Sequence, residues 1–230
     1  MDPEAIRGLR WPADRERIRE IQAEIGKRRS IAPLRRRPCL VAGIDASFLD
    51  DKIISVASLL SYPALEPLEE SVIVEKAGFP YITGLLSFRE GPAVLGALKG
   101  LKGRPDLLIF DGQGIAHPLG LGIAAFMGAL LNVPSIGSAK TRLVGEYKEP
   151  GPKRGDFSDL VYKGAVVGAV VRTRDNVKPL FVSPGHRIDV AGSVELVLEC
   201  APRFRITEPV RRAHLLSRKV KRELMDKSRA

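Results

Sequence analysis

The sequence has few cysteines and no long apolar run. Cys39 and Cys200 are its only cysteines, and they stand in no metal-ligand spacing. Two cysteines in 230 residues do not make a disulfide framework, so we expect a reducing compartment, the cytoplasm. Nowhere do about 18 apolar residues follow one another, and no membrane span is expected. The N-terminus lacks a basic segment joined to an apolar one, so a signal peptide is not expected either.

Acidic residues are in deficit. The chain has 37 lysines and arginines against 27 acids, for a net charge of +10. Basic residues can serve solubility alone, but a polyanionic partner explains the excess better. Nucleic acid is the commonest partner of that kind.

Apolar patterning predicts one α/β domain over residues 1–230, with a mixed sheet covered by helices on both faces. Isoleucines at helical spacing in "ADRERIREIQAEIGKRRS" predict an N-terminal helix at about residues 13–30. "CLVAGIDASFL", "KIISVASLLSYP" and "ESVIVEKAG" predict three successive strands, and the apolar "DLLIF" predicts a central strand buried on both faces. "YKEPGPKRGDFSD" predicts a loop. We expect the basic segment at about residues 219–230 to be a flexible tail.

Three acids stand where burial of a charge is unfavourable. Asp45 lies in the apolar "VAGIDASF", Asp111 follows "LLIF", and Glu90 begins a helix. If the two strands are neighbours, Asp45 and Asp111 meet and repel one another unless a divalent cation lies between them. Oxygen ligands favour Mg²⁺ or Mn²⁺ over zinc.

Each acid also has a purely structural interpretation. Ser87 and Glu90 have the spacing of a capping box, in which both side chains satisfy the first turn of a helix. Asp111 could belong to a plain turn, and Asp45 could accept backbone hydrogen bonds at a strand end.

A histidine stands on the least charged stripe of the last helix, beside Val210, Ala213 and Ser217. This residue, His214, is either a satisfied core histidine or a fourth metal ligand, directly or through water. The residue pattern favours neither interpretation.

Six segments occur in a characteristic order: "VAGIDASF", "PYITGLLSFRE", "DGQGIAHPLGLGIAA", "IGSAKTRLVG", "VSPGHRI" and "EPVRRAHL". Together they resemble endonuclease V, a family of deoxyinosine-directed repair nucleases. Most of these motifs are modest individually, but six in the right order are highly specific. The resemblance covers roughly residues 15–222.

The resemblance implies an RNase H-like fold and Mg²⁺-dependent hydrolysis of DNA, with Mn²⁺ able to substitute. Such enzymes cut the second phosphodiester bond 3′ to the deaminated base and leave 3′-hydroxyl and 5′-phosphate ends. The implied partner is DNA containing deoxyinosine or other deaminated bases. We expect the protein to act as a monomer.

Carried over by position, the resemblance makes Asp45, Glu90 and Asp111 the metal-binding carboxylates. His214 matches a position near a second metal ion.

Two further residues match positions of the active site. Lys140, in "GSAKTRL", matches a lysine near the scissile phosphate, and His117, in "IAHP", matches a histidine of the active-site loop. A nearby lysine adds positive charge where negative charge develops during phosphodiester hydrolysis.

The apolar turn "PYIT" matches the family's wedge, usually Pro-Tyr-Ile/Val-Pro, which here consists of Pro80, Tyr81, Ile82 and Thr83. Thr83 stands where the second proline normally stands. A tyrosine wedge fills the gap beside an extruded base. The alternative is an apolar loop folded over the core.

The resemblance places a hypoxanthine pocket at Leu86, Gly112, Ile123 and Gly137. Glycines let the backbone approach a flat ring closely, although turn formation is the alternative reason for them. In the predicted loop "YKEPGPKRGDFSD", Lys153 and Arg154 are expected to contact phosphate oxygens.

Two other functions stay open at this point. The same chemistry could act on inosine in RNA, since some relatives prefer RNA. From a different class, the protein could bind damaged nucleic acid without catalysis, although the three retained carboxylates argue against that.

Overall fold

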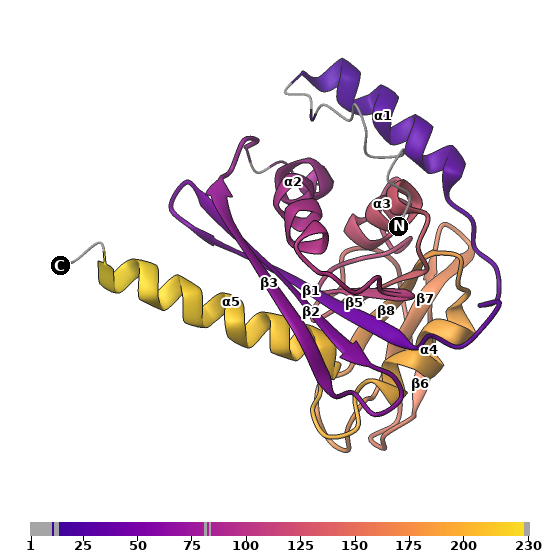
Figure 1. Cartoon of the computed structure of the whole chain (residues 1–230). Helices are drawn as coiled ribbons and strands as arrows, with labels where there is room; N and C mark the ends of the chain where they lie inside the picture. The colour runs from indigo at the N-terminus through magenta and orange to yellow at the C-terminus, as the bar shows by residue number, and fades with distance from the viewer. Residues whose placement is uncertain (1–10, 12–13, 81, 83, 228–230) are drawn as a thin grey trace.

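The computed structural model describes residue 11, residues 14–80, residue 82 and residues 84–227. Its centre is an eight-stranded mixed sheet (Figure 1). The strands are β1 (Leu40–Leu49), β2 (Lys52–Ser61), β3 (Pro67–Lys76), β4 (Leu107–Phe110), β5 (Ser135–Ala139), β6 (Phe157–Tyr162), β7 (Ala165–Val171) and β8 (Leu180–His186).

The strands lie in the order β3-β2-β1-β4-β5-β8-β7-β6. β1, β4 and β5 run parallel to one another, and the remaining neighbours pair antiparallel. The carboxyl ends of β1, β4 and β5 therefore meet at one edge of the sheet. In open α/β sheets this edge is where functional sites usually form.

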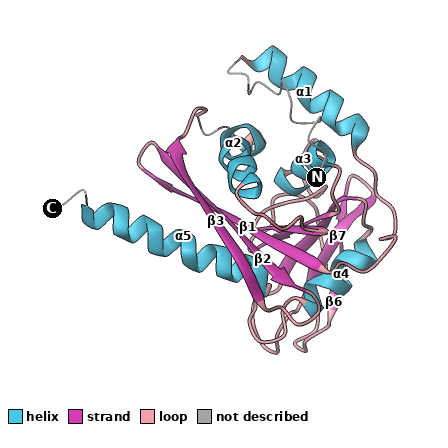
Figure 2. Cartoon of the chain, viewed as in Figure 1, coloured by secondary structure: helices cyan, strands magenta, loops and turns pink. Residues whose placement is uncertain are grey.

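Helices cover both faces of the sheet, as the apolar patterning predicts (Figure 2). On one face α1 (Arg15–Arg28), α2 (Leu86–Lys99) and α3 (Ile123–Leu131) share a core with residues of β1, β2 and β4. On the other face lie α4 (Val190–Glu199) and α5 (Glu208–Lys227). None of the described helices is both long and apolar enough to cross a membrane.

The central strands are apolar because both of their faces are covered. All four residues of β4 are buried, and in β2 every residue from Ile53 to Leu60 is buried. Burying a leucine or isoleucine side chain stabilises the fold by roughly 1.5–3 kcal/mol. The predicted N-terminal helix is confirmed as α1, whose Ile18, Ile21 and Ile25 face the core.

Two segments differ from the sequence-based expectation. The end of the predicted loop "YKEPGPKRGDFSD" forms the start of β6, an edge strand held by pairing with β7. The pattern of "EPVRRAHLLSRKVKREL" predicts a helix over residues 208–224, and α5 extends it to Lys227, so most of the basic segment at about residues 219–230 is helical. Val220 and Leu224 explain this, because they pack on the core beneath α5.

Candidate metal and nucleic-acid site

The two aspartates come together because their strands are parallel neighbours. Ile44 on β1 pairs with Phe110 on β4, and the Asp111 N–H donates to the Ile44 carbonyl at 3.0 Å. Asp45 follows Ile44 on β1, and Asp111 is the first residue after β4. Two carboxylates thus reach the same edge of the sheet from separate strands.

Helix α5 brings a histidine and a serine to Asp45. His214 Nδ1 lies 3.3 Å from Asp45 Oδ2, and Ser217 Oγ donates to the same oxygen at 2.7 Å. Gly43 makes this approach possible, because a Cβ at that position would lie 2.0 Å from the carbonyl carbon of Pro209. A glycine in "VAGID" therefore lets the start of α5 rest directly on β1.

Asp45, Asp111 and His214 each offer a ligand atom, and these atoms all lie within 4.8 Å of one another. Burial raises the pKa of Asp45, and the nearby charge of Asp111 raises it further, while the hydrogen bond from Ser217 opposes the rise. Buried carboxylates that repel one another gain from a shared cation. Two carboxylates and one imidazole are a donor set that can hold a divalent cation.

Glu90 faces the two aspartates from helix α2. Burial raises its pKa to about 8, with smaller contributions from the charges of Asp45 and Asp111; Arg89 acts in the opposite direction. Its oxygens are not among the atoms within 4.8 Å of one another, so Glu90 lines the cluster without completing it.

The capping-box interpretation of Glu90 is wrong. Helix α2 begins at Leu86, its N-cap is Leu85, and no side chain caps it. Ser87 is a buried residue of the first turn. The Glu90 carboxylate therefore has no capping role in α2.

Lys140 lies at the same edge, one residue past β5. Its Nζ forms an ion pair with Asp111 Oδ2. The Lys140 carbonyl accepts a hydrogen bond at 3.1 Å from Arg205, which also donates to the carbonyls of Lys178 and Pro179 at 2.7 and 2.8 Å. Sequence reasoning missed Arg205, since nothing in "APRFRIT" indicates that its guanidinium holds three carbonyls.

His117 lies behind the turn that contains the expected wedge. It is buried, burial lowers its pKa, and its Nδ1 accepts from the Leu119 N–H at 3.2 Å. A Cβ at Gly84 would lie 3.7 Å from His117 Nε2, and Gly84 has the left-handed φ of +83°. The imidazole therefore lies beside Gly84, and its hydrogen bond is to Leu119 in its own loop.

Only part of the expected wedge can be described. Pro80 is exposed, whereas Ile82 is partly buried and packs against the core beneath α2. Tyr81 and Thr83 lie outside the described residues, so the wedge and the alternative of a loop folded over the core both stay predictions.

Glycines pack closely behind Asp111. A Cβ at Gly137 would lie 2.2 Å from the Gly114 nitrogen and 2.6 Å from the Gly112 oxygen, and one at Gly112 would lie 2.7 Å from Ile123. Three of the four expected pocket residues are thus neighbours, and close approach of the backbone requires the glycines. Leu86, the fourth, begins α2 and is partly buried.

Gln113, between those glycines, is a polar residue that sequence reasoning left without a role. Its Nε2 donates to the Thr141 carbonyl at 2.9 Å, while its Oε1 is buried without a hydrogen-bond partner among the described residues. A buried acceptor without a donor is unfavourable by about 1–3 kcal/mol. A ligand N–H would satisfy it.

The two residues expected at phosphates have partners within the protein. Lys153 Nζ lies 3.3 Å from Asp175 Oδ2, and the Arg154 guanidinium donates to the Leu198 carbonyl at 2.7 Å. Both side chains are on the surface, so an exposed pair of this kind can exchange its partner for a phosphate at little cost.

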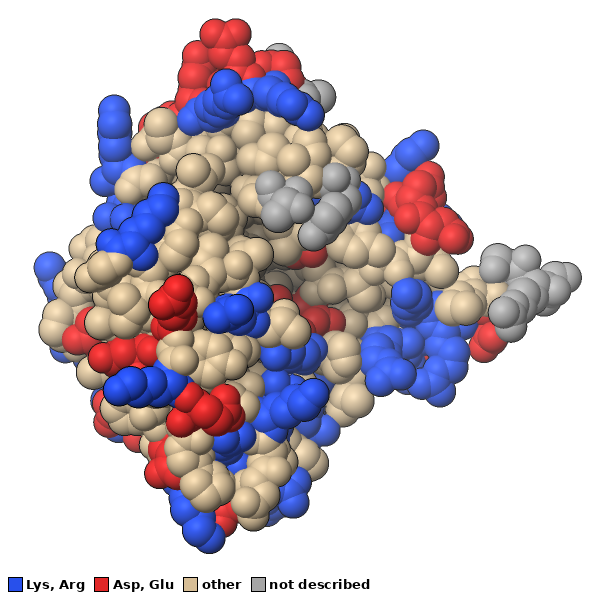
Figure 3. All heavy atoms as spheres, turned by 180° about the vertical axis from the view of Figure 1, so that it is seen from behind, with Lys and Arg blue, Asp and Glu red and all other residues tan. Residues whose placement is uncertain are grey.

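The surface around the site has a hollow form (Figure 3). Acidic atoms lie at the bottom of the hollow, and lysine and arginine side chains gather on the surface below it in this view. Positive charge gathered on this face favours a polyanionic partner.

Comparison with known proteins gives a consistent result. The family profile of Endonuclease V matches residues 21–215. Endonuclease V of Dictyoglomus thermophilum is 50% identical over 214 residues, which cover 92% of each chain.

Solved structures agree with this match. Endonuclease V from Streptomyces avermitilis has a TM-score of 0.88 to this chain at 37% identity, covering 94% of this chain and 96% of that one. A Ciona intestinalis Endonuclease V variant, in complex with a 23mer DNA containing an inosine followed by a ribo-adenosine, has a TM-score of 0.80 at 26% identity. That alignment covers 92% of this chain and 99% of that one.

Proposed function

Because the chain belongs to the Endonuclease V family and is therefore a nuclease, we propose that it is a Mg²⁺-dependent DNA repair endonuclease that recognises deoxyinosine. Its reaction is hydrolysis of the second phosphodiester bond 3′ to the lesion, leaving 3′-hydroxyl and 5′-phosphate ends. The observation that carries the proposal is the group of Asp45, Asp111 and His214 ligand atoms, all within 4.8 Å of one another at the edge of the sheet. In this proposal the eight-stranded mixed sheet belongs to an RNase H-like fold.

The chain's own residues have distinct parts in this reaction. Asp45, Asp111, Glu90 and His214 hold Mg²⁺ or Mn²⁺, and Ser217 orients the Asp45 carboxylate through its hydrogen bond. When bound, the metal ion lowers the pKa of a water and neutralises charge on the phosphate. Lys140 pairs with Asp111 in the free protein. Once a phosphate of the bound nucleic acid replaces Asp111 as its partner, the Lys140 ammonium adds positive charge beside that phosphate. His117 supports the turn that precedes α2.

The lesion is read where the glycines pack. Hypoxanthine has an N–H at ring position N1, where adenine has an acceptor. The Gln113 Oε1 atom, buried and without a partner among the described residues, has the polarity to accept from that N–H and to repel adenine. Leu86, Gly112, Ile123 and Gly137 enclose the extruded base, and Tyr81 fills the gap that it leaves in the stack.

A duplex nick assay tests the proposal. Incubation with Mg²⁺ and an oligonucleotide carrying one deoxyinosine, mapped to nucleotide resolution, should give one nick at the second phosphodiester 3′ to the lesion. Asp45→Ala should abolish nicking and retain binding. A cut at the lesion itself, release of the free base, or normal nicking by Asp45→Ala would overturn the assignment.

Two alternatives are separated by the same assay. A matched RNA oligonucleotide with one inosine, cleaved faster than the DNA, would make the protein an endoribonuclease of the same chemistry. Binding without cleavage of either would make it a non-catalytic damage-binding protein. We further propose a cytoplasmic monomer; both described cysteines are free thiols, as expected in a reducing compartment.

A further inference from the structure

A basic pocket lies at the edge of the sheet opposite the carboxylates. It is a cavity of about 570 Å³ between the linker that follows α1, the loops that precede β4 and β5, and the end of β8. Asp106, at its wall, precedes β4, and Asp111 follows that strand. At about 3.3 Å per extended residue, the pocket is some 16 Å from the metal site.

The pocket has an excess of positive charge. Arg28, Arg35, Arg36 and Arg187 line it, against the single carboxylate of Asp106. That carboxylate is already in use, because Oδ1 pairs with Arg36 at 3.2 Å and Oδ2 accepts from the backbone N–H groups of residues 39 and 40. It has no capacity left to neutralise the other arginines.

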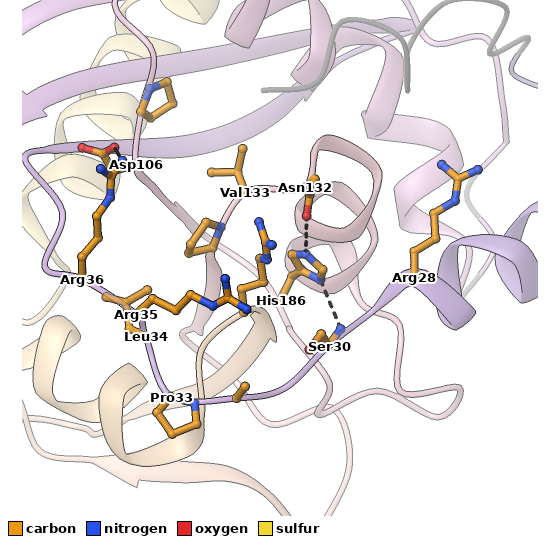
Figure 4. A pocket seen from close by; sticks show the side chains of 14 residues that line it. Arg28, Ser30, Pro33, Leu34, Arg35, Arg36, Asp106, Asn132, Val133 and His186 are labelled. Atoms are coloured by element: carbon orange, nitrogen blue, oxygen red, sulfur yellow. Dashed lines mark hydrogen bonds and ion pairs between the residues drawn. The ribbon is translucent and has the colours of Figure 1, made fainter.

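Two of the arginines have no side-chain partner among the described residues. Arg28 pairs with Glu24 on its own helix. Within the described part of the chain, the guanidinium groups of Arg35 and Arg187 form neither an ion pair nor a hydrogen bond. In Figure 4 the Arg35 side chain extends from the linker toward the middle of the pocket, where His186 lies. An anion is the chemical partner that this arrangement lacks.

A polar anchor holds the pocket in shape. His186 Nδ1 accepts from the Ser30 N–H at 3.2 Å, and its Nε2 donates to Asn132 Oδ1 at 3.3 Å (Figure 4). The Arg187 N–H donates to the Ser30 carbonyl at 2.6 Å. Ser30 is therefore fixed on both sides, and the linker that carries Arg35 is attached to the strand end that carries Arg187.

The backbone of Arg187 adopts a left-handed conformation, which is unusual for a residue other than glycine. Its φ is +52°, in the left-handed region, which is unfavourable by about 1–2 kcal/mol for a residue with a Cβ. Glycine or asparagine would occupy the position with less strain. Backbone strain of this kind is concentrated at functional sites, and here it sets the direction of an unpaired guanidinium.

We propose that this pocket binds the phosphate group of a nucleotide unit, at a site separate from the nuclease centre. Planar guanidinium groups match phosphate oxygens two at a time, which makes arginine the preferred residue for such anions. Val133, Pro134 and Pro105 form an apolar wall beside the arginines, suited to the base or sugar of the same nucleotide. A cavity of this size is typical of small-molecule sites.

Titration calorimetry with three probes tests the site: inorganic phosphate, adenosine 5′-monophosphate, and single-stranded DNA without inosine, each in the absence of Mg²⁺. The test variant is Arg35→Gln combined with Arg187→Asn, since asparagine tolerates the left-handed backbone. The matched control is Arg203→Gln, an exposed arginine outside the pocket.

The double variant should bind at least one probe about tenfold or more weakly, and the control should stay within about twofold of the unmodified protein. Loss for the mononucleotide alone identifies free nucleotides as the source of the phosphate, and loss for DNA alone identifies a nucleic-acid strand. Unchanged binding of all three probes, or no binding of any by the unmodified protein, overturns the proposal.

Two controls separate this result from the nuclease assignment. Both altered side chains are exposed, and asparagine relieves the backbone strain at residue 187, so the thermal midpoint of the double variant should be no lower than that of Arg203→Gln. Its nicking rate with saturating inosine-containing DNA should be unchanged, because the pocket lies across the sheet from the carboxylates. Failure of the unmodified protein to nick such DNA would refute the nuclease proposal and leave the binding result intact.

Discussion

Replacing Glu90 with glutamine should stabilise the metal-free protein. Burial and the charges of Asp45 and Asp111 raise the pKa of Glu90 from 4.5 to about 8. An acid whose pKa is raised by folding binds a proton more tightly in the folded state, so it destabilises the fold wherever the unfolded chain is ionised. This penalty is absent below about pH 4.5, grows as the pH rises toward 8, and is constant above that.

The expected size follows from those two values. Each pH unit between the unfolded and the folded pKa is worth about 1.4 kcal/mol. At about pH 7 Glu90 is protonated in the folded protein and ionised in the unfolded chain, and this difference reduces the free energy of unfolding by about 3 kcal/mol. For a chain of this length, that corresponds to a rise of roughly 6–12 °C in the melting temperature of Glu90→Gln.

Thermal unfolding after treatment with a chelator measures the effect. The difference between Glu90→Gln and the unmodified protein should be near zero at about pH 4.5 and largest above about pH 8. Added Mg²⁺ should shrink it, because a cation that binds the folded carboxylates stabilises the unmodified protein preferentially. Glu75→Gln is the matched control, since Glu75 is exposed on β3 and belongs to no described ion pair.

Equal melting temperatures for Glu90→Gln and Glu75→Gln at about pH 7 would refute the reasoning. So would a difference that does not change with pH, because it would indicate packing of the amide instead of charge.

Three further predictions concern the same edge of the sheet. His214→Ala should raise the Mg²⁺ concentration needed for half-maximal nicking, because it removes one of the three clustered ligand atoms. An unchanged Mg²⁺ requirement would indicate that His214 is a core histidine and not a metal ligand. Gly43→Ala should destabilise the fold by about 1–3 kcal/mol or more in chemical denaturation, since the new methyl group would overlap the backbone of Pro209; Gly78→Ala, with nothing within 4 Å of its Cβ, is the matched control. Arg205→Ala should lower kcat for nicking more than it raises KM, because it releases the carbonyl of Lys140, and Arg205→Lys should restore little of the rate; full activity of Arg205→Ala would contradict the positioning role.

The sequence predicts those parts of the fold and site that depend on local apolar patterning. "DLLIF" and "VAGIDASFL" are apolar on both faces, and they form the buried strands that deliver Asp45 and Asp111. Strand β6 escaped prediction because "FSDLVY" is half-exposed and gains its conformation from pairing with β7.

Residues that act through tertiary hydrogen bonds could not be predicted. The sequence places Ser217 on the least charged stripe of α5, but its hydrogen bond to Asp45 depends on how α5 crosses β1. Arg205 and Gln113 stand in unremarkable local sequence, and their partners come from distant loops. The capping-box spacing of Ser87 and Glu90 predicts the wrong start for α2. The helix begins at Leu86, one residue before Ser87, and its N-cap Leu85 makes no side-chain hydrogen bond.

The contact between α5 and β1 links the nuclease site to the order of protein synthesis. Asp45 and Ser217 are separated by 172 positions along the chain, and their hydrogen bond closes the site. Domains fold as the chain emerges, N-terminal parts first. A nascent chain can therefore assemble the strands that carry both aspartates while His214 and Ser217 are still untranslated. Until α5 has docked, the chain lacks one of the three clustered ligand atoms and the hydrogen bond that Ser217 donates to Asp45.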